Sequence, residues 1–250
     1  MFLGYRRTAA LLVGLTLLLP TWSGEAHEIP ADVTVQAFVK PDGGTLRMIV
    51  RVPLVSMRDY DFPVREPGYL IISDADPLIQ GAAVEWIANY VQMYEGSELL
   101  ARPVVAAVRI AIPGDRGFRT YDEAIANVLS APLSDDIELP PQQAMLDVLL
   151  EWSIMSEESD FSIDSRFAQL GIRTVTVLRF LPAGGTERAF QYSGNPGLVR
   201  LDPRWHQAAW RFVVLGFDHI LDGIDHLLFL FCLVVPFRSF WALVPIITSF

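Results

Sequence analysis

The chain of 250 residues is unusually apolar, with 52% hydrophobic residues, only 19% charged residues and a mean hydropathy of +0.34. An ordinary soluble domain carries about 25% charged residues, so the composition argues against a plain globular protein. The net charge of −10 argues against a nucleic-acid-binding protein, because phosphates are neutralised by a basic surface. The single cysteine, Cys232, excludes an internal disulfide.

The first apolar segment is typical of a secretory signal peptide. Arg6 and Arg7 precede the apolar run 8–20, and Gly24 and Ala26 form a small-x-small cleavage site. The run is short for a bilayer span, and an uncleaved anchor helix is the alternative. We expect residues 1–26 to be removed, so that the mature chain begins with the next residue.

Residues 27–203 are predicted to form an exported, acidic, mainly β domain, with 25 Asp and Glu against 14 Lys and Arg. Two stretches, 77–94 and 121–129, are predicted helices. Apolar residues alternate with others, between Gly- and Pro-containing turns, as in strands. The predicted strands are 33–39, 46–55, 146–154, 174–180 and 187–192, with turns at 41–44 and 182–185. We expect a β-sandwich with short helical insertions, followed by α-helical transmembrane segments.

The second apolar segment, 204–238, is predicted to be the first transmembrane helix. Its apolar part is longer than the roughly 20 residues that span a bilayer. Trp205, Trp210 and Trp241 suit the two aromatic belts of a membrane. Residues 239–250 start another apolar stretch, which either re-enters the membrane or begins a second, incomplete span. We expect the latter, with further transmembrane helices beyond it. Export of the preceding domain makes the first helix run inward.

Five ionisable residues lie in the central stretch 216–228 of this predicted helix. At about 100° per residue they share one stripe about 120° wide. A carboxylate at the centre of a bilayer costs about 2.5–3.5 kcal/mol, so the stripe needs a compensating partner. Imidazoles and carboxylates three, four and seven residues apart can converge on one divalent cation, and imidazole suits nickel, cobalt, zinc and copper. A structural ion-pair network with Arg211 is the alternative. The stripe consists of Asp218, His219, Asp222, Asp225 and His226.

His219, five further residues and then Asp225-His226 resemble the His-x5-Asp-His signature of HupE/UreJ-type nickel/cobalt permeases. The run 217–229 is similar to the branch of that family with an exported N-terminal domain, and the resemblance is specific over about 195–250. It implies a permease, not an enzyme, in the bacterial inner membrane, which spans the bilayer several times and has its N-terminal domain in the periplasm. It implies Ni²⁺ or Co²⁺ as the ion, no organic cofactor, and His219, Asp225 and His226 as metal-site residues.

The expected partners are the lipid bilayer, the further transmembrane helices and a periplasmic metal donor, with no nucleic acid. A second hypothesis is a membrane-anchored binding module without transport activity. In it, the free amine and imidazole of His27 chelate a divalent metal or the domain binds a partner protein. A third, an intramembrane metallohydrolase, lacks a His-Glu-x-x-His motif. His206, which follows Trp205, is predicted to be an interfacial residue rather than a ligand.

Overall fold

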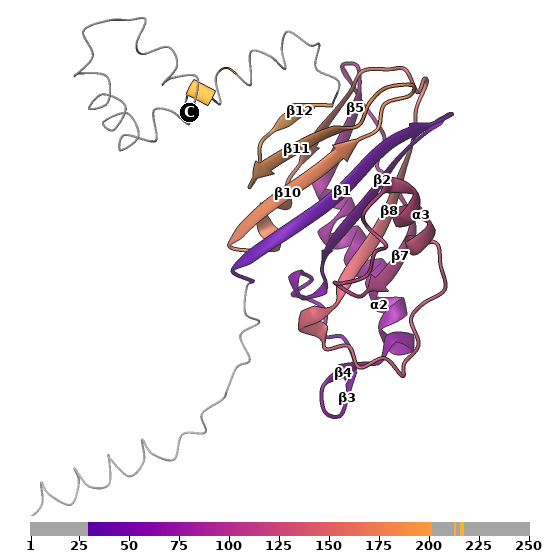
Figure 1. The fold of residues 1–250 in the computed structure, drawn as a ribbon, viewed down its shortest axis with the longest axis vertical. Coiled ribbons are helices and arrows are strands. Elements are labelled where there is room, and N and C mark those ends of the chain that lie inside the picture. The colour runs from indigo at the N-terminus through magenta and orange to yellow at the C-terminus, as the bar shows by residue number, and fades with distance from the viewer. Residues whose placement is uncertain (1–29, 202–212, 214–215, 218–250) are drawn as a thin grey trace, which may run out of the picture.

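The computed structural model describes residues 30–201 together with 213, 216 and 217, and residues 30–201 form a β-rich domain (Figure 1). The mainly β fold predicted from the sequence is confirmed. The large sheet has the order β11 (Arg188–Ser193), β10 (Arg173–Phe180), β1 (Asp32–Asp42), β2 (Thr45–Pro53), β8 (Met145–Ser153) and β7 (Val104–Ala111). The smaller sheet has the order β12 (Leu198–Arg200), β9 (Phe161–Ser165), β5 (Val91–Glu95) and β6 (Glu98–Leu99), and β3 (Val64–Arg65) pairs with β4 (Tyr69–Leu70).

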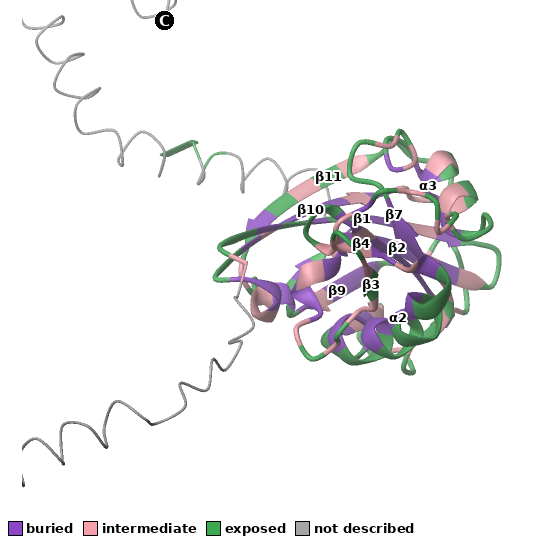
Figure 2. Cartoon of the chain, turned by 90° about the horizontal axis from the view of Figure 1, so that it is seen from below, coloured by how far each residue is buried: buried purple, intermediate pink, exposed green. Residues whose placement is uncertain are grey.

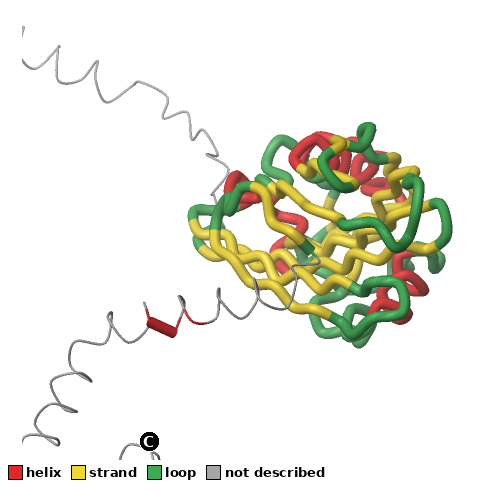
Figure 3. Tube along the Cα trace, turned by 90° about the horizontal axis from the view of Figure 1, so that it is seen from above, coloured by secondary structure: helices red, strands yellow, loops and turns green. Residues whose placement is uncertain are grey.

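Helices complete the domain and lie around the strands (Figure 3). Two are α-helices, of which the longer packs along β7 and the shorter lies over β7 and β8. The others are single 3-10 turns in the connections. The helices are α2 (Ile72–Trp86), α3 (Tyr121–Val128), η1 (Leu54–Ser56), η2 (Ala88–Tyr90), η3 (Pro141–Gln143) and η4 (Phe167–Leu170).

One apolar core receives side chains from both larger sheets. The alternation predicted for the first strand is confirmed, because Val33, Val35 and Val39 of β1 are at most 1% exposed. From the smaller sheet, Phe161 of β9 contacts Phe180 of β10, with ring centroids 6.4 Å apart. Buried strand residues therefore lie at the centre of the domain, and the exposed side of α2 is turned outward (Figure 2).

The other face of the large sheet is covered by α3 and the loop before it. Phe38 of β1 occupies the face opposite to the core residues of its strand, yet it is fully buried. Its ring lies 5.3 Å from that of Phe118 and 6.2 Å from that of Tyr121. The predicted helix 121–129 is confirmed as α3, and Thr120 caps it by accepting the Glu123 N–H through Oγ1 at 3.2 Å.

Both predicted hairpins are confirmed, and a parallel pairing joins them. In the first, Asp42 pairs with Thr45, so the turn consists of Gly43 and Gly44 alone and is tighter than the predicted 41–44. Gly43 has φ +59°, which a residue with a Cβ adopts only at a cost. β10 and β11 form the second hairpin, and β1 runs parallel to β10 over eight pairs.

The predicted helix 77–94 is wrong at both ends. α2 begins at Ile72, five residues before the prediction, and contains Pro77 in its second turn. Its start is stabilised from a distant loop: the Asp135 carboxylate accepts the Ser73 N–H at 2.9 Å and the Ser73 hydroxyl at 2.8 Å. The helix ends at Trp86, and residues 91–95 form β5 because they pair with β9. Neither contact is local in sequence.

Several expectations concern residues outside the described part of the chain. These are the signal peptide 1–26, the span 204–238 apart from Val213, Gly216 and Phe217, and the segment 239–250. Among the described residues, no helix combines the length and the apolar character that a membrane span requires.

Candidate functional site

The residues of the predicted metal stripe lie outside the described residues. The same holds for His27, the candidate ligand of the second hypothesis, and for His206. Their geometry therefore stays a prediction. The stripe residues concerned are Asp218, His219, Asp222, Asp225 and His226.

The described domain offers only oxygen atoms as strong metal ligands. The four histidines of the chain are residues 27, 206, 219 and 226, and its cysteine is residue 232, so residues 30–201 contain neither type. Among the described residues, no three acidic side chains are grouped so that they could hold a metal ion. Carboxylate oxygens suit magnesium and calcium, whereas nickel and cobalt sites use imidazole. Any imidazole ligand in this protein therefore comes from outside residues 30–201.

The C-terminal end of the domain is tied firmly to its core. Leu201 is fully buried, and its N–H donates to the Phe161 carbonyl at 2.9 Å. Only Asp202 and Pro203 separate it from the start of the predicted transmembrane helix at Arg204. Two residues extend at most about 7 Å. Covalent geometry thus keeps this end of the domain next to the segment that carries the stripe.

Loops at the same end are held together by Glu95. Its carboxylate accepts the N–H groups of Met155 and Ser156 at 3.0 Å and the hydroxyl of Ser159 at 2.7 Å. Burial on its own raises the pKa of Glu95, but these hydrogen bonds outweigh it and lower the pKa below its ordinary value. Glu157 extends the contact to the first hairpin by accepting the Gly43 N–H at 3.0 Å.

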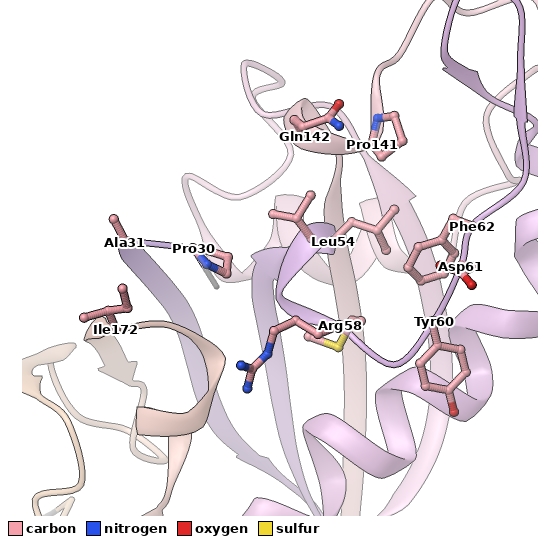
Figure 4. A pocket seen from close by; sticks show the side chains of 12 residues that line it. Pro30, Ala31, Leu54, Arg58, Tyr60, Asp61, Phe62, Pro141, Gln142 and Ile172 are labelled. Atoms are coloured by element: carbon pink, nitrogen blue, oxygen red, sulfur yellow. The ribbon is translucent and has the colours of Figure 1, made fainter. Parts of the chain in front are cut away.

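A cavity of about 860 Å³ opens at the opposite end of the domain. β10 connects the two ends, since it starts beside Pro30 and finishes beside Phe161. Its eight residues span about 25 Å. In Figure 4, Pro30, Ala31 and Ile172 form one side of the cavity, and Tyr60, Asp61 and Phe62 form the other. The lining is completed by Leu54, Val55, Met57, Arg58, Pro141 and Gln142.

Arg58 is the cationic group of this lining. Its guanidinium lies over the Trp86 ring, 5.1 Å from the centroid, and Nη2 donates to the Gln169 carbonyl at 2.9 Å. Its Nε atom is buried and has no hydrogen-bond partner among the described residues. Arg58 therefore offers a cationic hydrogen-bond donor within this lining.

Sequence reasoning did not identify the cavity. Its walls come from the two residues before β1, the segment 54–62, η3 and the loop before β10, which are far apart along the chain. No motif marks them. The one local signal is the mixture of apolar, aromatic and charged residues in 54–62, immediately after a strand of regular alternation.

A second feature missed by sequence reasoning is a buried ion pair beneath α3. Arg51 of β2 and Asp147 of β8 are paired in register, and Nε and Nη2 of the arginine donate to the carboxylate at 2.6 and 2.7 Å. Asn127 of α3 donates to the same carboxylate at 2.8 Å and accepts from Arg109 at 3.0 Å. Asp115, in the loop before α3, accepts from Arg51 at 2.8 Å.

This network joins α3 and the loop before it to two strands of the large sheet. Asp147 is fully buried, and burial raises its pKa, although Arg51 and Asn127 partly offset that effect. Both carboxylate oxygens accept hydrogen bonds from neighbouring side chains. The arrangement therefore attaches α3 and the preceding loop to the sheet.

Comparison with known proteins concerns the C-terminal part of the chain. Residues 198–250 match the family model described as HupE / UreJ protein, which confirms the resemblance inferred from the sequence. This is about a fifth of the chain, and it starts at the first residue of β12, so the matched segment begins inside the folded domain. The HupE/UreJ family is a membrane-associated family of the transporter type and not an enzyme family. No curated protein matches the chain.

Proposed function

We propose that this protein is a permease-like membrane protein for a divalent transition metal ion, nickel or cobalt. The observation that carries the proposal is the HupE/UreJ match over residues 198–250, which include His219, Asp225 and His226. The family has a role associated with nickel and cobalt transport. The ion is the cargo, and the protein needs no organic cofactor in this mechanism.

In the proposed site, the two imidazoles of His219 and His226 bind the ion through nitrogen. Asp225 supplies negative charge, which compensates the cation inside a medium of low dielectric constant. Asp218 and Asp222 lie on the same predicted stripe and either add oxygen ligands or orient the histidines. The absence of histidine and cysteine from residues 30–201 supports this assignment, because the nitrogen ligands then come from the flanking segments.

The proposed location is the bacterial inner membrane, with the β domain on the periplasmic side. Support comes from the signal-peptide pattern at residues 1–26 and from the tie between Leu201 and Phe161. The two-residue connection 202–203 leaves the domain little freedom to move away from the first helix. In this arrangement the domain stands at the outer mouth of the metal pathway, where a periplasmic donor delivers its ion.

The second candidate function is that of a membrane-anchored binding module, and the cavity at the N-terminal end favours it. His27 lies only three residues before Pro30, which lines that cavity. Isothermal titration of residues 27–203 with Ni²⁺, Co²⁺ and Cu²⁺ separates the two candidates. The binding module requires that this fragment alone binds the metal ion, whereas the permease requires the stripe residues for metal binding.

The test of the permease uses the full-length protein in bacterial membranes. His219→Ala and His226→Ala are each expected to abolish accumulation of radioactive nickel and cobalt, because removing an imidazole leaves the ion with too few nitrogen ligands. His206→Ala is the matched control, since this histidine belongs to the same segment but lies off the stripe, and it should retain uptake. Immunoblotting checks that all three variants reach the membrane. Uptake at the wild-type rate in both stripe variants contradicts the proposal.

A further inference from the structure

β12, the last strand of the domain, is fastened where it begins. It lies at the edge of the smaller sheet, and the turn 194–197 carries the chain to it from β11 of the large sheet (Figure 1). In this turn the Gly194 N–H donates to the Thr174 carbonyl at 2.9 Å, and the Asn195 amide oxygen accepts the Ala168 N–H at 3.0 Å. The end of a domain is well ordered only where it is tied down, and these contacts supply the first tie.

The exit of β12 is fixed in the core. Val199 is 6% exposed and Leu201 is fully buried, whereas Leu198 is 59% exposed. The Phe161 carbonyl accepts the Leu201 N–H, and the Phe161 ring contacts that of Phe180 in the large sheet. The chain therefore leaves the domain from a residue that is connected through Phe161 to both sheets.

The sequence predicts that the link after Leu201 is stiff as well as short. It consists of Asp202 and Pro203, and Arg204 begins the predicted transmembrane helix. The ring of a proline fixes its φ, and the residue before a proline is restricted to extended conformations. Most of the dihedral freedom of a two-residue link is thus removed, so a rotation of the domain would be transmitted to the helix.

The family comparison points to the same strand. The match covers residues 198–250, so it begins at the first residue of β12 and not at the predicted helix. A flexible tether requires only a permissive composition, not a particular sequence. The part of the chain that resembles the family therefore includes the connection between domain and helix as well as the membrane segment.

We infer that β12 and the link 202–203 form a rigid joint, through which the β domain sets the position of the first transmembrane helix and thereby of the metal stripe. The role of the stripe rests on the proposed function, whereas the rigidity of the joint does not depend on it. Ligands must be held to within about 0.5 Å for a site to work, and selectivity among metals depends on their geometry. Val199 and Leu201 are positioning residues in this arrangement, because they lie in the domain core and act through the helix.

The first test measures the rigidity of the joint in the full-length protein in lipid nanodiscs. A fluorophore on Leu129→Cys, in a Cys232→Ala background, reports the rotation of the domain, because Leu129 is 62% exposed at the end of α3. With the native joint, the anisotropy decay should follow the slow tumbling of the whole disc. Insertion of Gly-Ser-Gly-Ser-Gly-Ser between Leu201 and Asp202 should add a fast component, because such a linker is flexible.

The matched control places the same insertion between Gly184 and Gly185, in the turn that joins β10 to β11. It should leave the anisotropy decay unchanged, because this turn does not lie between the domain and the helix. A fast component with the native joint overturns the inference, and so do equal decays for the native joint and the insertion after Leu201. Neither result depends on metal transport.

The second test connects the joint to the metal site through uptake of radioactive nickel and cobalt. The insertion after Leu201 leaves the contacts of β12 intact, yet it should lower nickel uptake about tenfold, as the loss of an outer contact that orients a metal ligand does. It should also change the nickel-to-cobalt ratio about threefold, because misplaced ligands alter selectivity. The insertion between Gly184 and Gly185 should keep both at their wild-type values.

The ratio separates a misplaced helix from a smaller amount of protein, because a loss of protein lowers the uptake of both ions equally. Immunoblotting of the membranes measures that amount. If the insertion after Leu201 frees the domain but leaves uptake and ratio at their wild-type values, the joint does not position the stripe and the inference is overturned. Wild-type uptake in His219→Ala and His226→Ala would instead contradict the proposed function, and with it the role of the joint in transport, while the anisotropy decay still decides whether the joint is rigid.

Discussion

Replacement of Arg51 by methionine is expected to destabilise the β domain strongly. The substitution leaves the Asp147 carboxylate fully buried, with only the Asn127 amide as a hydrogen-bond donor to it. Breaking one side of a buried ion pair costs about 3–5 kcal/mol. A domain of this kind has a total free energy of unfolding of roughly 5–15 kcal/mol, so the loss is a large part of it.

The matched control is Arg47→Met. Arg47 lies on the same strand and pairs with Glu151 at 2.9 Å and with Asp42, but these side chains are about a third or more exposed. Such a pair is worth up to about 1 kcal/mol. The double variant Arg51→Met/Asp147→Leu removes both buried charges and should recover part of the lost stability, although it leaves the Asn127 amide without its acceptor.

Urea unfolding of residues 27–203 measures these differences, and Trp86 and Trp152 are the tryptophans in that segment. With a slope of about 2 kcal/mol per molar urea, a loss of 4 kcal/mol lowers the midpoint by about 2 M. Without Arg51, only Asn127 still offsets the rise that burial causes in the pKa of Asp147, so the deficit of this variant should shrink as the pH falls towards 4. If Arg51→Met costs no more than Arg47→Met, the buried network does not hold the domain together as argued.

Three further changes test other contacts. Glu95→Gln should destabilise the domain at pH 7. Because folding lowers the pKa of Glu95, the stability that this carboxylate contributes is present above its ordinary pKa of 4.5 and is lost as the pH falls below that value. The difference in unfolding free energy between variant and wild type in urea titrations should therefore close in acid. Asp135→Ala removes the acceptor at the start of α2 and should cost about 1 kcal/mol in the same assay, with Asp136→Ala as a neutral neighbour. Thr120→Ala should cost about 1 kcal/mol through the cap of α3, whereas Thr120→Ser should be near neutral; equal losses for the two would refute the capping role.

The sequence by itself determined those features whose signal is local. Alternation along 33–39 and 146–154, and the Gly-Gly turn after Asp42, predict strands because a period of two and a tight turn are properties of a few neighbouring residues. The His219–His226 spacing is also a local pattern, and it lies within the segment 198–250 that the family model matches, but the metal site it suggests lies outside the described residues and stays a prediction.

Tertiary contacts decided the rest. α2 begins at Ile72 because a carboxylate 62 residues away from Ser73 caps it, and 91–95 is a strand because 161–165 pairs with it. Arg51 meets Asp147 only through the register of β2 and β8, and the cavity exists only where four separate segments come together. Such contacts depend on which distant segments the chain brings side by side, and the periodicity of a single segment does not show which segments pack against it.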